Sequence, residues 1–225
     1  MGTDNFHKRK KDERKARISK ALELKIGCWL IVCEGKQTEV NYFESLIDYA
    51  NSKSSKKIKH NVIGLGMNTN SLVKSVDDLL KRTESYIEAS IIPYEKIFVV
   101  FDKDSFSASN FNEAINRCNR LGYIPLWNNE CFELWYILHF EYLTSGTGRD
   151  QYFDRLTMLL GKKYDKTDKH FELLGCVDKL PIAYKNAVKL QSIYDKNTSY
   201  AKMKPCTTVY KIIDEIEECL NIKLK

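Results

Sequence analysis

Long apolar runs are missing from this sequence of 225 residues. Its longest mostly apolar stretch, residues 26–33, is far shorter than the ~20 residues that a membrane-spanning helix needs. No apolar segment follows the first charged residues within signal-peptide range either, so we expect no secretory leader. These absences favour a protein of the cytoplasm.

Paired cysteines are missing as well. The seven cysteines are odd in number, scattered, and contain no Cys-x-x-Cys motif. This pattern argues against a disulfide framework and against a zinc site, and it favours reduced thiols. Internal repeats and low-complexity tracts are also lacking, whereas 43% of the residues are hydrophobic and 12% are aromatic. The chain therefore has enough apolar side chains to build a folded core.

Positive charge is concentrated at the N-terminal end. The first 25 residues contain nine Lys or Arg and four acids, so they carry +5 of the net charge of +6. We expect residues 1–25 to form a flexible basic arm in front of a near-neutral body. Together with a lysine-rich loop at residues 53–59, the arm would attract a polyanion such as nucleic acid. A solubilising tail and a tether for an acidic partner protein are the alternatives. The residues expected to contact nucleic acid are Lys8, Arg9, Lys10, Lys11, Arg14, Lys15, Arg17, Lys56 and Lys57.

Strand and helix patterns alternate over residues 26–127. Short apolar runs predict buried strands at residues 26–33, 60–65, 96–101 and 123–127. Apolar residues at helical spacing predict a helix after each of the first three strands. Their expected N-terminal caps are Thr38, then Asn70 or Ser71, then the capping-box pair Asn110 and Glu113. The alternation is typical of an α/β fold, a mostly parallel sheet with helices on both faces.

The pattern changes after residue 127. Helical spacing, without intervening strand signals, predicts helices at residues 131–142, 150–160, 181–194 and 207–220. The first of these segments is dense in aromatic and aliphatic side chains and is expected to be buried. We therefore expect a mostly helical C-terminal part, residues 128–225, that packs on the core and completes its site.

Three acids follow strands of the expected sheet: Glu34, Asp102 and Asp104. Ligands of parallel α/β sheets bind at the carboxyl ends of the strands. If the chain stays extended after its strand, Asp102 and Asp104 point the same way, about 7 Å apart. Converging carboxylates repel one another unless a cation neutralises them, and their hard oxygens suit Mg²⁺ or Mn²⁺. The alternative is that these acids are solvated turn formers.

Glu133 interrupts an otherwise apolar segment. An unpaired ionised carboxylate would be costly there, so a metal, a Lys or Arg, or solvent must accompany it. Glu130 lies three residues earlier and would share its helical face. In the alternative interpretation, Glu133 faces water on an amphipathic helix.

In their order and spacing, these motifs resemble the RloB family over about residues 26–215. The matching segments are Glu34-Gly35-Lys-Gln-Thr38-Glu39, Val99-Val-Phe-Asp102-Lys-Asp104, Asn129-Glu-Cys-Phe-Glu133-Leu-Trp-Tyr-Ile-Leu-His139, Tyr164-Asp-Lys166 and Pro205-Cys-Thr207. The sequence departs from the family pattern in having Val40 in place of a proline. It also has Asn128-Asn129-Glu130 in place of Ser-Asn-Pro, which would alter the pocket wall.

The resemblance implies a TOPRIM-type core at residues 26–127 and a metal-dependent phosphodiesterase site. Glu34, Asp102 and Asp104 would hold Mg²⁺ or Mn²⁺, and Glu34 is the alternative general base. Glu133 would complete the catalytic set, and Lys166 would steady the transition state. An ordinary solvated face is the alternative for Lys166, which lies among other lysines. The residues expected to support the site are Gly35, Thr38, Glu39, Asn129 and His139.

Two of these supporting residues have plain alternative roles. Glu39 suits the first turn of a helix because an acid there meets the positive end of the helix dipole. His139 is a single histidine in an apolar segment, which is commonly a core residue.

The RloB family is linked with anti-phage defence and abortive infection in bacteria, and it often has an AAA-type ATPase partner. Related TOPRIM effectors act as nucleases, some on tRNA. The resemblance thus implies a Mg²⁺-dependent nuclease that acts on RNA ahead of DNA. The alternatives are a non-catalytic sensor subunit that binds a nucleotide or a partner, and a nucleotidyl or phosphoryl transferase.

Overall fold

The computed structural model describes residues 28–67, 69–84, 94–168 and 170–225. The basic arm lies outside the described residues, and so do the expected nucleic-acid contacts Lys8, Arg9, Lys10, Lys11, Arg14, Lys15 and Arg17. None of the helices in the described ranges combines the length and the apolar character that a membrane crossing requires.

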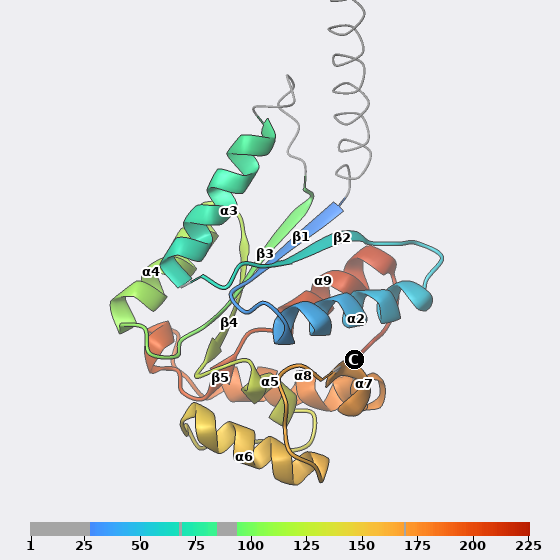
Figure 1. The fold of residues 1–225 in the computed structure, drawn as a ribbon, viewed down its shortest axis with the longest axis vertical. Helices are drawn as coiled ribbons and strands as arrows, with labels where there is room; N and C mark the ends of the chain where they lie inside the picture. Colours follow the sequence, from blue (N-terminus) through green and yellow to red (C-terminus); the bar gives the residue numbers. More distant parts are fainter. Residues whose placement is uncertain (1–27, 68, 85–93, 169) are drawn as a thin grey trace, which may run out of the picture.

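A five-stranded sheet forms the centre of the molecule, in the order β2-β1-β3-β4-β5 (Figure 1). The strands are β1 (Cys28–Cys33), β2 (Lys59–Gly64), β3 (Lys96–Asp102), β4 (Ile124–Asn129) and β5 (Cys206–Thr207). The first four are parallel, and β5 is antiparallel to β4. All six residues of β1 are buried, as the continuous apolar run predicts for a strand that is covered on both faces.

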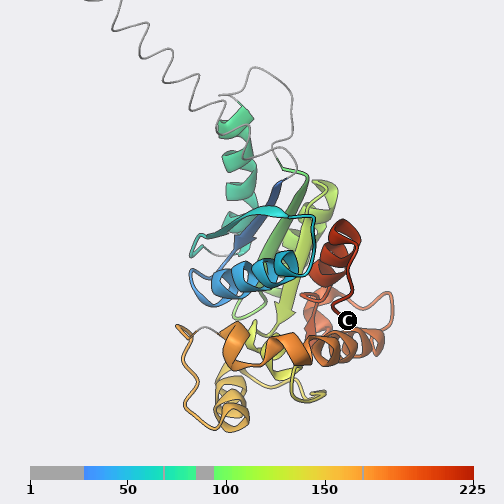
Figure 2. The ribbon, with the colours of Figure 1, turned by 90° about the vertical axis from the view of Figure 1, so that its right-hand side faces the viewer.

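Helices cover both faces of this sheet, which confirms the predicted α/β fold. They are α2 (Thr38–Ser52), α3 (Thr69–Glu84), α4 (Ala108–Arg120), α5 (Glu133–Ile137), α6 (Arg149–Leu160), α7 (His170–Leu173), α8 (Cys176–Ser192) and α9 (Lys211–Leu220), with a 3₁₀ turn η1 (Tyr200–Lys202). Two apolar clusters, one on each face, hold these layers together. Figure 1 shows α3 and α4 on one side and α2 and α9 on the other. In Figures 1 and 2, α5 and α6 lie at the end of the sheet where β4 ends.

None of the three predicted helix caps is correct. Helix α3 begins at Thr69, so Asn70 and Ser71 lie inside it. Gln37 occupies the N-cap position of α2 without a side-chain hydrogen bond, and Thr38 is the first helical residue. Ser107 caps α4, because its hydroxyl accepts from the backbone N–H of Asn110 at 3.2 Å. Capping residues recur often in this sequence, and only the backbone geometry decides which one satisfies the free N–H groups.

The C-terminal part also differs from the prediction. Helix α5 is five residues long, although the apolar segment predicts a helix over residues 131–142, and Glu130 lies outside it. Helix α8 begins at Cys176 and contains Pro181, which the sequence predicts as its start. The expected helix from residue 207 begins only at Lys211, because residues 206–207 form β5. A two-residue strand leaves no alternation to recognise in a sequence.

Candidate active site

A cavity of about 290 Å³ opens where β1 and β3 end. These two strands are parallel neighbours, so the residues that follow them emerge at the same edge of the sheet. The lining residues are Glu34, Gly35, Lys36, Gln37, Thr38, Glu39, Asp102, Asp104, Glu133, Arg149 and Lys166. Five carboxylates and three cationic side chains therefore face one space.

The ends of β1 and β3 are joined directly by the first of these carboxylates. Oε2 of Glu34 accepts from the backbone N–H of Asp102 at 3.2 Å. The backbone N–H of Glu34 in turn donates to the carbonyl of Val100 at 2.9 Å. The structure thus brings together the glutamate and the aspartate that the sequence predicts to meet.

Gly35 makes room for the Glu39 carboxylate. A Cβ atom at Gly35 would lie 2.1 Å from Oε2 of Glu39, a distance that no side chain tolerates. Burial raises the pKa of Glu39, and so does the charge of Glu133, against the opposing effects of its backbone hydrogen bond, Lys166 and Arg149. The first turn of α2 is therefore part of the cavity wall, as the resemblance implies for Glu39.

Asp102 is held in place from the neighbouring strand. Nδ2 of Asn128 donates to Oδ1 of Asp102 at 3.1 Å, and the hydroxyl of Thr207 donates to Oδ1 of Asn128 at 2.6 Å. Strand β5 thus orients Asp102 through Asn128. This role of Asn128 was not predicted from the sequence, where the residue was notable only for its place in a segment that departs from the family pattern.

Asp104 reaches the cavity by a route that the sequence did not predict. Its φ angle is +36°, so the chain is not extended after Asp102 and turns sharply instead. The backbone N–H of Asp104 donates to the carbonyl of Glu130 at 3.0 Å, which fixes this turn. Both aspartates still face the same cation.

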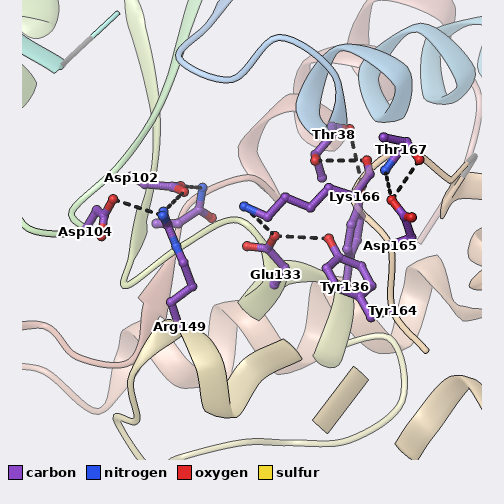
Figure 3. Close-up of polar contacts among 11 residues, drawn as sticks. Thr38, Asp102, Asp104, Glu133, Tyr136, Arg149, Tyr164, Asp165, Lys166 and Thr167 are labelled. Atoms are coloured by element: carbon purple, nitrogen blue, oxygen red, sulfur yellow. Dashed lines mark hydrogen bonds and ion pairs between the residues drawn. The ribbon is translucent and has the colours of Figure 1, made fainter. Parts of the chain in front are cut away.

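That cation is Arg149, the first residue of α6, and sequence reasoning missed it. Its Nη1 atom lies 3.1 Å from Oδ2 of Asp104, and its Nη2 atom lies 3.6 Å from Oδ2 of Asp102 (Figure 3). Burial raises the pKa of Asp102, as do the charges of Glu39, Glu133 and Glu34, whereas Arg149 opposes the rise. The only indication of this arginine in the sequence was the general need of converging carboxylates for a positive charge nearby.

Glu133 lies on the other side of the cavity and is only 2% exposed. The hydroxyl of Tyr164 donates to its Oε1 atom at 3.0 Å. Lys166 Nζ lies 3.6 Å from the same oxygen, with a side chain that is 47% exposed (Figure 3). Glu133 therefore does not face water, and a lysine and a phenol accompany the buried carboxylate.

Thr38 holds the segment that carries Lys166. Its hydroxyl donates to the carbonyl of Lys166 at 3.3 Å, and the hydroxyl of Tyr136 donates to the carbonyl of Thr38 at 3.3 Å. Instead of capping α2, Thr38 ties the start of that helix to residues far along the chain.

Two of the expected supporting residues do not line the cavity. Nδ2 of Asn129 donates to the carbonyls of Ala201 and Met203, at 3.0 and 2.9 Å, and so joins β4 to the segment before β5. His139 is buried with Nδ1 2.9 Å from the carbonyl oxygen of Trp135, and burial lowers its pKa to about 4. Both residues support the fold around the site.

Lys56 and Lys57 lie at the opposite end of the sheet from the cavity. They follow the C-terminal end of α2 and precede β2, whereas the cavity lies at the N-terminal end of α2. Lys57 donates to backbone carbonyls of Asn51 and Ser54. Their contact with nucleic acid stays a prediction, and a ligand that reaches both places must span α2, about 22 Å.

The donors of the cavity suit a hard divalent cation, since all five acidic side chains offer carboxylate oxygens. Within the described ranges, however, no three His, Cys, Asp or Glu side chains are grouped so that they could hold a metal ion as they stand. The guanidinium of Arg149 lies against Asp102 and Asp104 instead. The chemical type of these side chains therefore suits a divalent cation. In this structure, the cation that contacts two of them is an arginine.

Comparison with known protein families identifies the family of this chain. Residues 29–216 match the family model described as RloB-like protein. The comparisons with curated proteins and with solved structures gave no match. The matched range runs from β1 into α9 and includes every residue that lines the cavity.

Proposed function

The chain belongs to the RloB-like protein family, and on that premise we propose that it is a divalent-metal-dependent nuclease with a TOPRIM-type core. One observation carries the proposal: Glu34, Asp102 and Asp104 follow neighbouring parallel strands and line one cavity. The same cavity contains Arg149 and Lys166. Carboxylates can hold a divalent cation, and cationic side chains can bind phosphate oxygens. Metal-dependent cleavage of a phosphodiester uses both kinds of group.

Each side chain has a defined part in this proposal. Glu34, Asp102 and Asp104 would hold Mg²⁺ or Mn²⁺, which supplies charge for the phosphoryl oxygens and lowers the pKa of bound water. Asn128 fixes Oδ1 of Asp102, so that Oδ2 is the oxygen that faces the cavity cation. Lys166, half-exposed at the rim, would contact a phosphate oxygen of the substrate. Glu34 is the alternative acceptor for the proton of the attacking water.

The wider context follows from the family. We propose that the protein is an effector of bacterial anti-phage defence and abortive infection, that it works with an AAA-type ATPase partner, and that RNA such as tRNA is its substrate ahead of DNA. The basic arm, residues 1–25, would capture the nucleic acid. Deleting residues 1–20 should weaken substrate binding and its salt dependence, whereas loss of ATPase association alone would identify the arm as a docking segment.

A specific observation favours a second candidate function. Arg149 already pairs with both aspartates, and Tyr164 already donates to Glu133. A cavity that balances part of its own charge suits a non-catalytic subunit that senses a nucleotide or a partner. In that case, calorimetry would detect no binding of Mg²⁺ or Mn²⁺.

A cleavage assay with matched variants tests the proposal. Purified protein is incubated with labelled RNA and labelled DNA in Mg²⁺ or Mn²⁺, with and without the ATPase partner. Asp102→Asn should abolish cleavage, whereas Asp48→Asn, an exposed acid on α2, should cleave like the wild type. Absence of cleavage under every condition, or full cleavage by the Asp102 variant, would refute the nuclease.

A further inference from the structure

Arg149 makes an incomplete set of contacts where it lies. Its two terminal nitrogens contact Asp104 and Asp102, but its Nε atom is buried and has no hydrogen-bond partner among the described residues. A buried donor without a partner is costly, and a guanidinium satisfies its donors best against a flat, bidentate acceptor. The aspartate pair is thus a resting place for Arg149 that leaves part of its bonding capacity unused.

The position of Arg149 also leaves its side chain partly open to solvent. Its side chain is 34% exposed, whereas that of Asp102 is 11% exposed, so the guanidinium lies between the buried carboxylate and solvent. It is the first residue of α6, directly after Gly148, and a Cβ atom at Gly148 would meet no atom within 4 Å, so the start of this helix is open on that side. The partly exposed side chain therefore has solvent, rather than protein, on the side away from Asp102.

The three cations of the cavity are not equivalent. Lys166 pairs with Glu133, and Lys36 has no ion pair with any described residue and lies over Gly66. Only Arg149, in the described part of the cavity, contacts the two aspartates that the proposed function gives to the metal. A divalent ion on those carboxylates would lie a few ångströms from the guanidinium, and the two positive charges would repel each other.

From these contacts we infer that Arg149 is a built-in competitor of the metal ion and a phosphate-binding residue of the substrate site. In the metal-free protein it pairs with both Asp102 and Asp104 and offsets part of their charge. When a divalent ion takes these carboxylates, Arg149 turns to the mouth of the cavity and binds a phosphate of the nucleic acid through paired N–H groups. This inference rests on the proposed function, because it concerns the same site.

The first experiment measures metal binding rather than activity. Calorimetry with Mn²⁺ compares the wild type with Arg149→Gln, Lys166→Gln and Lys36→Gln. Each variant removes one positive charge from the cavity, and only the first removes a contact to the aspartates. We expect Arg149→Gln to bind Mn²⁺ about tenfold more tightly, the effect of one charge-assisted pair, and the lysine variants about threefold or less.

The second experiment measures nucleic-acid binding in Ca²⁺, an ion with slower chemistry than Mg²⁺, so that capture is separated from cleavage. Arg149→Gln should bind RNA about tenfold more weakly although it binds metal more tightly. Arg149→Lys keeps the charge but not the paired N–H groups, and it should recover metal competition more fully than RNA binding. Circular dichroism melts test whether each variant is folded. If Arg149→Gln unfolds, Arg149→Lys provides the measurement.

The outcomes separate this inference from the proposed function. If the wild type binds Mn²⁺ and Arg149→Gln binds it no more tightly than Lys36→Gln does, Arg149 is no competitor and the inference is wrong. Unchanged RNA binding by a folded Arg149→Gln protein overturns the phosphate role. If no protein of the set binds Mn²⁺, the metal-dependent function itself is wrong, and the inference falls with it.

Discussion

The two ends of the cavity balance the charge of their carboxylates in different ways. At the aspartate end, Asp102 and Asp104 share the guanidinium of Arg149, a partner 34% exposed that comes from another part of the chain. At the glutamate end, Glu133 accepts from the phenol of Tyr164, with Lys166 more distant. At the aspartate end, the balancing group is the partly exposed guanidinium of Arg149. At the glutamate end, it is the hydroxyl of a tyrosine whose ring is part of the core.

This difference separates chemistry from stability. Tyr164 is buried, and the centroid of its ring lies 5.5 Å from the centroid of the Phe153 ring. Its hydroxyl therefore cannot move away from Glu133 without disrupting the core. Arg149 can be exchanged for another cation. We therefore expect the carboxylates of the aspartate end to govern turnover and the Glu133–Tyr164 pair to govern folding, and the predictions below test this division.

The largest effect should be on cleavage. Asp102→Asn should reduce the single-turnover rate at least about 10³-fold, because an amide is a poor metal ligand and the developing charge loses its support. Glu133→Gln keeps the acceptor for Tyr164 and should reduce the rate about tenfold at most. Quench-flow cleavage of the same RNA measures both variants. Equal losses would show that the two ends form one catalytic unit and would break the comparison.

The next effect is a pH dependence of folding behind the glutamate end. His139 is buried two residues after α5, and its pKa is lowered to about 4 by burial, with Lys179 adding to the effect. The unfolded chain has an ordinary histidine pKa of about 6.5, so unfolding takes up a proton between these values. The stability that neutral His139 contributes is complete above about pH 6.5 and is lost as the pH falls toward 4, at most about 3 kcal/mol.

Urea unfolding at a series of pH values measures this contribution. His139→Asn offers a donor for the Trp135 carbonyl but does not titrate, so the difference between wild type and variant should shrink as the pH falls. All other titratable groups are the same in both proteins, so their contributions to the pH dependence cancel in this difference. A difference that is constant from pH 7 to pH 4 would show that the pKa of His139 is the same in the folded and the unfolded chain.

Stability should change in opposite directions at the two ends. Glu133→Ala leaves the Tyr164 hydroxyl buried without its acceptor and should lower the free energy of unfolding by about 2 kcal/mol. Asp102→Asn removes a carboxylate whose pKa is raised by burial and by three neighbouring acids, so it should raise the free energy of unfolding by about 1 kcal/mol. Urea titrations without divalent ions measure both variants. Destabilisation by both would mean that the aspartates also hold the fold together.

The site residues at strand ends could be predicted from the sequence, whereas the contacts made by other parts of the chain could not. The apolar runs before Glu34 and Asp102 determine both the strands and where they end, so their meeting was predictable. The contact of Arg149 depends on a loop and on the placement of α6, which no local pattern encodes. The support of Asp102 by Asn128 depends on β5, whose two residues are too few for a periodic signal.

The same reasoning explains why the turn at Asp104 was missed. An extended D-x-D segment was the simplest assumption, but the chain turns to a positive φ and bonds to the carbonyl of Glu130. That bond joins residues from two different loops and is therefore a tertiary effect. Local patterns predicted which acids face the cavity, and only the folded chain showed which cation they meet.

The smallest effect tests whether the glutamate end needs its lysine at all. Lys166 approaches Glu133 only to 3.6 Å and is 47% exposed, so solvent screens most of the attraction. Nζ of Lys166 also lies 4.8 Å from the centroid of the Phe153 ring, so Lys166→Met removes an exposed cation–π contact as well and should lower the free energy of unfolding by about 0.5 kcal/mol. Tyr164→Phe, measured beside it, should cost more, about 1 kcal/mol, because it removes the hydroxyl that Glu133 accepts from. If the lysine variant were the less stable of the two, charge rather than hydrogen bonding would hold Glu133, and the two ends of the cavity would follow the same physical rule.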